Sequence, residues 1–194
     1  MEEDERIVGR QIGRPPRGMA GVEVRCPWGY PAVVSVDPLV AHRRGRGRRE
    51  PFPTRLWLTC PVLVEQVSRL EAAGAVDRVE AAIDADPALA ARVRADHARY
   101  AAERAAALRG EALEEAERRG LAAVLRESGV GGCRDHSRVK CLHAHWAHHL
   151  ARGGSAVGAL LEGPSAPAWC AEGDVRCEAF GPAPVKPAPG PVRG

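Results

Sequence analysis

Histidine and cysteine gather in one stretch, residues 138–151, which holds four of the seven histidines of this 194-residue chain. The stretch has neither proline nor glycine, and a glycine pair precedes and follows it, so it is predicted to form one short helix. At about 3.6 residues per turn, Cys141, His145 and His148 share one face of this helix, and His143 points away from them. Thiolate and imidazole groups on one helix face are the ligands that a zinc or iron site requires.

Two further cysteines, Cys26 and Cys60, are each followed by proline at the end of a predicted strand. Residues 22–26 alternate apolar and polar side chains, and residues 32–36 are rich in β-branched ones, which predicts a hairpin. Residues 55–59 predict a third strand. If the first and third strands run in the same direction, Cys26 and Cys60 lie at the same edge of the sheet.

The rest of the folded chain predicts helices, because apolar residues recur there at three- and four-residue steps. The expected helices cover residues 61–73, 76–85, 87–108 and 111–127, with a last turn at 156–161. The predicted fold class is therefore α+β, with a small antiparallel sheet of about three strands packed against several α-helices and a flexible C-terminal tail.

The chain is expected to form a single domain over residues 13–162. Residues 1–12 read as a charged, flexible lead-in, and residues 42–50 as an arginine-rich, solvated loop. Residues 110–128 look like an inserted helix. Residues 163–194 become rich in proline, glycine and alanine, so we expect a largely disordered tail.

Charge and hydropathy exclude several classes of protein. The net charge of +3 is close to balanced, which argues against nucleic acid as a partner. No apolar run approaches the roughly 20 residues of a membrane span, and the acidic N-terminus lacks the features of a signal peptide. We therefore expect a cytoplasmic protein whose six cysteines stay reduced. In that compartment, a set of cysteines indicates either a metal site or buried small residues.

Four separated blocks, in this order, resemble an actinobacterial family catalogued as domain of unknown function five hundred and one. The blocks are residues 13–18, Cys26-Pro27, residues 52–61 and residues 138–148, and the resemblance runs roughly from Arg10 to Gly158. It implies a small cytosolic protein without an assigned activity. Genes of the family often lie near those of a septum-formation initiator and an exopolyphosphatase-like protein, which implies a link to cell division or to the envelope.

The chain departs from the family pattern in three places. Trp28 stands where the family commonly has a second cysteine after Cys26-Pro27. Family members usually have no counterpart of His145, and residues 110–127 look like an insertion.

The first functional hypothesis is a metal site for zinc or an iron–sulfur cluster. Its ligands would be Cys26, Cys60 and Cys141 with His148, or with His143 or Cys177 in place of His148. No close Cys-x-x-Cys pair supports it, and the alternative is that these cysteines are buried small residues. The further candidate site residues on these segments are His143, His145, Lys140, Arg14, Arg17, Thr59 and Cys177.

Two other hypotheses remain open. In an enzyme, Cys141 or Cys60 would be the nucleophile and His148 or His143 the base, with Lys140 and the helix N-terminus lowering the pKa of Cys141. In a non-catalytic interaction protein, Arg14, Arg17 and Lys140 would form a patch for an anion or for an acidic protein partner. The sequence indicates neither a reaction nor an oligomeric state.

Overall fold

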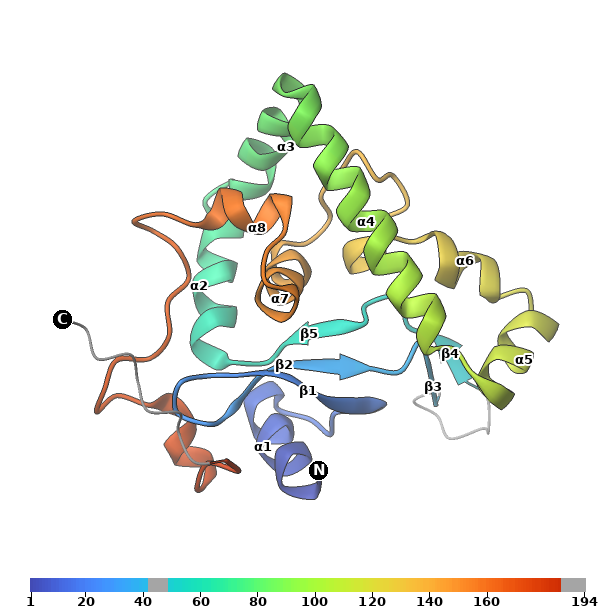
Figure 1. Ribbon diagram of the computed structural model, residues 1–194. Coiled ribbons are helices and arrows are strands. Elements are labelled where there is room, and N and C mark those ends of the chain that lie inside the picture. Colours follow the sequence, from blue (N-terminus) through green and yellow to red (C-terminus); the bar gives the residue numbers. More distant parts are fainter. Residues whose placement is uncertain (42–48, 186–194) are drawn as a thin grey trace.

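A three-stranded antiparallel sheet forms the centre of the protein, as Figure 1 shows in a computed structural model that describes residues 1–41 and 49–185. The sheet has the order β1-β2-β5, formed by β1 (Met19–Arg25), β2 (Pro31–Val36) and β5 (Leu56–Leu58). All six residues of β2 are buried, because the sheet is covered on both faces. The predicted α+β class, hairpin and third strand are confirmed.

Helices cover the two faces of the sheet unequally. Helix α1 lies against one face, whereas α7 lies on the other between α2 and α4, with α3 and α8 beyond it (Figure 1). The helices are α1 (Glu2–Ile12), α2 (Pro61–Ala72), α3 (Ala75–Ala85), α4 (Pro87–Ala107), α5 (Gly110–Arg118), α6 (Ala122–Glu127), α7 (Leu142–Arg152) and α8 (Ala156–Leu161), with 3₁₀ segments η1 (Val130–Gly132) and η2 (Arg176–Phe180). No helix in the described ranges is long and apolar enough to cross a membrane.

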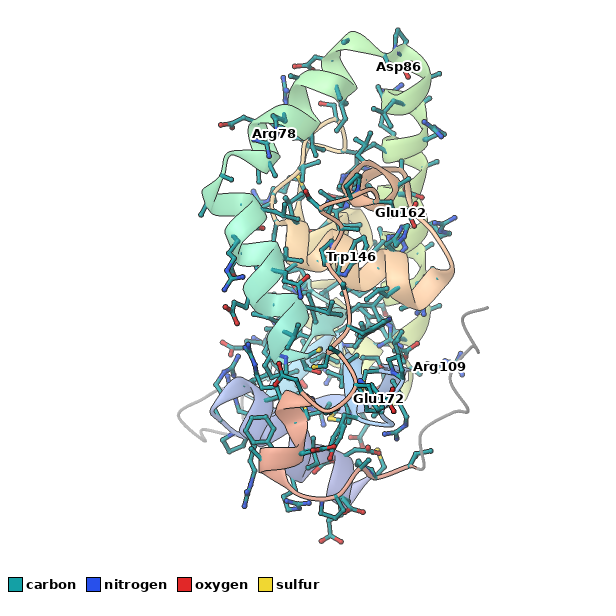
Figure 2. All side chains as sticks on the ribbon, turned by 90° about the vertical axis from the view of Figure 1, so that its left-hand side faces the viewer. Arg78, Asp86, Arg109, Trp146, Glu162 and Glu172 are labelled. Atoms are coloured by element: carbon teal, nitrogen blue, oxygen red, sulfur yellow. The ribbon has the colours of Figure 1, made fainter. Side chains whose placement is uncertain are left out.

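Alternation along the strands explains both apolar layers. Val33 and Leu56 pack toward α7, whereas Val34 and Val36 pack against Val8 of α1, as expected where successive side chains point to opposite faces. On the helical side, Trp146 projects from α7 into the core between the helices and is 4% exposed (Figure 2).

Local signals fix the ends of the helices that surround the site. Pro61 begins α2 and Pro87 begins α4, at the position where proline costs no hydrogen bond. The carboxylate of Asp86 accepts the N–H of Ala88 at 2.8 Å and caps α4. Helix α7 ends at Gly153, whose φ of 68° favours glycine.

Residues 1–12 form helix α1 and not the expected lead-in. Ile7 and Val8 are fully buried, with Ile12 partly buried beside them. The sequence reading gave weight to the charges of the first turn and overlooked this apolar side.

Two other segments differ from expectation. The expected helix over 110–128 is two helices, because Gly120 breaks it at a φ of 65°. Strands β3 (Leu39–Ala41) and β4 (Arg49–Pro51) form a second, two-stranded sheet. Residues 42–48, most of the predicted arginine-rich loop, lie outside the described residues.

Part of the segment expected to be a disordered tail packs against the folded domain. Val175 and Cys177 are buried against Ile7 and Tyr30, so this part of the chain packs against α1. Residues 186–194 lie outside the described part of the chain.

Arg104 is a buried cation in α4, 0% exposed. Its guanidinium donates to the carbonyls of Leu125 and Pro53, both at 2.7 Å, and to that of Ser128. These bonds join α4 to the end of α6 and to the segment before β5.

Candidate metal centre

The candidate site forms where α7 begins, beside the last turn of α2. Cys141 precedes α7, and its backbone is extended (φ −157°, ψ 116°). Glu71, near the end of α2, accepts the backbone N–H of Leu142 through Oε1 at 2.7 Å. A carboxylate is favourable at the positive end of a helix, so Glu71 provides the cap that the side chain of Cys141 does not make.

The start of α7 decides which side chains face Cys141. The predicted face of Cys141, His145 and His148 requires Cys141 to be helical. Because Cys141 is extended, its side chain leaves that face and meets His143, with 3.9 Å between Sγ and Nδ1. The prediction that His143 points away from Cys141 is therefore wrong.

Three different ligand types converge here. The ligand atoms of Glu71, Cys141 and His143 all lie within 4.8 Å of one another, and the three residues are partly buried. Nδ1 of His143 is 3.3 Å from Oε2 of Glu71. Within residues 1–41 and 49–185, no other group of three histidine, cysteine or acidic side chains is this close.

The other ring nitrogen fixes the orientation of His143. Nε2 lies 3.2 Å from the carbonyl oxygen of Val64 and 3.0 Å from Oγ of Ser68, both on α2. A carbonyl oxygen only accepts, so Nε2 must carry a proton and donate it. In the neutral ring, the lone pair is then on Nδ1 and points at Cys141 and Glu71. Such an outer hydrogen bond is typical of histidines that bind metals.

Cys141 and His143 shift each other's proton affinity. The hydrogen bond with Cys141 raises the pKa of His143 to about 9 against the opposing effect of burial, and the charge of Glu71 adds to the rise. Burial raises the pKa of Cys141, but its hydrogen bonds with His143 and with the backbone of Ala144 outweigh burial, and the net pKa is lowered. Each group therefore stabilises the charged form of the other, the thiolate of Cys141 and the imidazolium of His143.

A pocket of about 390 Å³ opens beside this group. Its lining includes Leu56, Trp57 and Leu58, three successive residues of β5. Successive strand residues point to opposite faces, so the pocket must run along the edge of the sheet at β5. The remaining lining residues are Ile12, Arg14, Thr54, Gly131, Cys141, His143 and Ala144.

Cys26 and Cys60 follow the ends of β1 and β5, which run in the same direction on either side of β2. The predicted common edge is therefore present, but neither thiol belongs to the group at Cys141. Burial raises the pKa of Cys60 to about 11 and also raises the pKa values of Cys26 and Cys177. Cys26 and Cys177 pack around Tyr30 together with Cys170. Protonated thiols in such surroundings behave as small apolar residues.

His145 and His148 point from α7 into the core and are 1% and 0% exposed. Among the described residues, none of their four ring nitrogens has a hydrogen-bond partner. The ring of His145 packs edge-on against His97, and that of His148 against Tyr100. Burial lowers the pKa of His145 to about 3 and that of His148 to about 4, so both rings are neutral at pH 7.

Of the remaining sequence candidates, Arg14 lines the pocket, and Arg17, Thr59 and Lys140 do not. The guanidinium carbon of Arg14 lies 4.9 Å from the centre of the Trp57 ring. Lys140 is exposed, and Arg17 donates to the carbonyl of Ala41 at 3.2 Å. Thr59 is buried, and its hydroxyl has no hydrogen-bond partner in the described ranges.

Sequence reasoning missed Glu71, together with Val64 and Ser68, because all three lie on α2, far from Cys141 along the chain. Their spacing of four and three residues occurs on one face of any helix, so it does not by itself indicate a site. Only the packing of α2 on α7 gives them a role.

A family model described as "Protein of unknown function (DUF501)" matches residues 22–162. This region contains Glu71, Cys141 and His143 but not Arg14. No curated protein and no solved structure matches the chain.

Proposed function

We propose that this chain, which belongs to the DUF501 family, is a zinc-binding protein in which Glu71, Cys141 and His143 hold one Zn²⁺ ion. The observation that carries the proposal is the convergence of their three ligand atoms within 4.8 Å, beside a pocket. A fourth position would face the pocket, where a water molecule or a small ligand completes the coordination.

The donor set favours zinc over the other metals that the cysteines suggested. Zn²⁺ accepts sulfur, nitrogen and oxygen ligands together at about 2.0–2.3 Å. An iron–sulfur cluster needs about four cysteine thiolates, and this group has one. Three protein ligands with an open position are typical of catalytic zinc, where the ion activates bound water or polarises a bound oxygen.

Zinc binding here should release protons. His143 is protonated at pH 7 because its pKa is about 9, and its Nδ1 must lose that proton before it can bind a metal. The hydrogen bond from Nε2 to Val64 keeps the ring in place during the exchange. Zinc affinity should therefore fall as the pH falls below about 9.

The test is zinc stoichiometry of chelator-treated protein after one equivalent of Zn²⁺ is restored, measured by elemental analysis. The wild type should retain about one ion per chain, and Cys141→Ser and His143→Ala should retain almost none. The matched control is Cys133→Ser, since Cys133 is buried outside the site and its thiol donates to the Asp135 carbonyl, as a serine hydroxyl also can.

Cys26→Ser separates this proposal from the ligand set that the sequence predicted. If Glu71, Cys141 and His143 hold the ion, the Cys26→Ser variant should retain as much zinc as the wild type. Loss of zinc in Cys26→Ser but not in His143→Ala would contradict the proposal and favour the set of Cys26, Cys60, Cys141 and His148.

A second candidate function rests on the lowered pKa of Cys141, which suits a nucleophilic thiolate with His143 as its acid–base partner. Iodoacetamide labelling distinguishes the two. Zinc should protect Cys141 from alkylation if it is a ligand, whereas a nucleophile in a metal-free site reacts quickly with or without zinc. The interaction-protein hypothesis and the cytoplasmic location stay predictions.

A further inference from the structure

The pocket beside Cys141 has a cation at its wall. Arg14 follows the C-terminal glycine of α1 and reaches β5, where its guanidinium stacks over the indole of Trp57 at 4.9 Å. Trp57 is itself braced by Phe52, whose ring meets it edge-on at 5.3 Å. A guanidinium held over an aromatic face by a cation–π contact keeps its N–H groups free to donate to other acceptors.

No carboxylate neutralises Arg14 among the residues that the structure describes. Other arginines of the fold behave differently. Arg25 forms two hydrogen bonds with Asp4, at 2.8 and 2.9 Å, and Arg152 bonds Glu23 and Glu103 at 3.0 and 2.8 Å. With respect to the residues that the structure describes, Arg14 lies over Trp57 but has no charged partner, so its donors are available to a ligand.

The rest of the lining complements this cation. Thr54 contributes a hydroxyl to the lining. Ile12 and Leu58 provide partly exposed apolar surface, whereas Leu56 and Ala144, which also line the pocket, are buried. The volume of about 390 Å³ is that of a site for a small molecule.

We propose that this pocket binds a small organic anion, with its phosphate or carboxylate group on the guanidinium of Arg14 and its apolar body against Ile12 and Leu58, which are partly exposed. Planar guanidinium groups bind both kinds of oxyanion through two parallel N–H···O bonds. The inference deepens the proposed function and rests on it in one respect: the oxyanion would lie beside the open position of the zinc ion. The contact with Arg14 needs no metal.

Trp57 is a positioning residue in this arrangement, since it holds the guanidinium of Arg14 and does not bind the charged group of the ligand.

The arrangement also predicts which molecules should bind weakly. A neutral molecule of the same shape leaves the donors of Arg14 unpaired, and inorganic phosphate lacks the apolar body.

The experiment is isothermal titration of the full chain with phenyl phosphate, benzoate, inorganic phosphate and phenol, each with zinc-loaded and with chelator-treated protein. Phenyl phosphate or benzoate should bind at one site, and phenol at least about tenfold more weakly, which is the usual effect of losing a charged hydrogen bond. The stronger of the two anions identifies the headgroup.

Arg14→Gln should weaken binding of the anion at least about tenfold and leave zinc stoichiometry unchanged, because Arg14 is exposed and bonds no metal ligand. Arg17→Gln is the matched control, since it removes the same charge outside the pocket lining and should change binding less than about twofold.

Unchanged binding in Arg14→Gln, equal losses in both variants, or no saturable binding of any anion would overturn the inference. Failure of the zinc site gives a different result. Cys141→Ser would then hold as much zinc as the wild type, while anion binding would still depend on Arg14.

Discussion

Acid should destabilise this protein through His148, which is fully buried in α7 with its ring edge-on to Tyr100. No described group bonds its ring nitrogens. Charged side chains of both signs on α4 and on α7 itself oppose one another: Asp96 and Glu103 of α4 raise its pKa, and Arg99 of α4 and Arg152 of α7 lower it. Burial is the largest effect and lowers the pKa to about 4.

The magnitude follows from proton linkage. Above pH 6.5, His148 is neutral in the folded and in the unfolded chain, so it adds no pH dependence. Below pH 6.5 the unfolded chain binds a proton that the folded chain refuses until about pH 4. At pH 5, which is about 1.5 units below the pKa of 6.5 in the unfolded chain, protonation stabilises the unfolded state by about 2 kcal/mol, at about 1.36 kcal/mol per unit.

The assay compares urea unfolding of the wild type and of His148→Leu at pH 7.5 and pH 5.0, with chelator present so that metal binding does not contribute. Leucine fills a similar volume and removes two unpaired nitrogens, so the variant should be at least as stable as the wild type at pH 7.5. The wild type should lose about 2 kcal/mol more than the variant between the two pH values.

The control is His136→Gln, at a partly exposed histidine whose ring bonds the carbonyl of Glu127. It should follow the wild type at both pH values. If His148→Leu loses as much stability at pH 5.0 as the wild type does, burial of His148 is not what makes the protein sensitive to acid, and the reasoning fails.

Three further predictions concern single contacts. Arg104→Met should lower the free energy of unfolding by about 3–5 kcal/mol, since three backbone carbonyls lose their donor; a loss under about 1 kcal/mol in urea unfolding would contradict this. Glu71→Gln keeps an acceptor for the N–H of Leu142 but not the charge, so the fold should persist while zinc affinity, measured by chelator competition, falls at least about tenfold. Asp86→Ala should cost about 1 kcal/mol in thermal unfolding through loss of the α4 cap, with zinc binding unchanged.

Family membership leaves the chemistry to be read from the site itself. The match to DUF501 covers residues 22–162 and carries no activity. Within that range, Glu71, Cys141 and His143 are the described residues whose geometry suits a metal. Arg14 lies outside it, so the zinc proposal and the anion proposal draw on different parts of the chain and can fail separately.

Most of the secondary structure could be read from local patterns. The strands at Met19–Arg25, Pro31–Val36 and Leu56–Leu58 lie where alternation and β-branched residues predict them, and prolines and glycines mark the helix ends. These signals act over a few residues, through steric limits on the backbone and through side-chain period, so they survive without tertiary contacts.

The location of Cys26 and Cys60 at the same edge of the sheet could also be predicted from the sequence. It follows because β1 and β5 each pair antiparallel with β2 and therefore run in the same direction as one another. Whether the two thiols bind a metal does not follow from this, because shared position at an edge sets no distance between sulfur atoms.

The candidate site was only half visible in the sequence. Cys141 and His143 stood out as residue types, but a regular helix through Cys141 placed His145 and His148 beside it. In the structure, one extended residue before α7 reverses this choice and buries His145 and His148 in the core. A boundary shift of a few residues changes which side chains meet, and sequence patterns locate boundaries poorly.

Residue type and local spacing therefore determined that this chain has an α+β fold with cysteine and histidine side chains gathered at one short helix. Tertiary packing alone decided that Glu71 of α2 caps that helix, that Val64 orients His143, and that Arg14 reaches the same pocket from the end of α1. These partners are distant in sequence and have no period in common. They meet because burying the apolar faces of α1, α2 and α7 on one small sheet leaves their polar edges together.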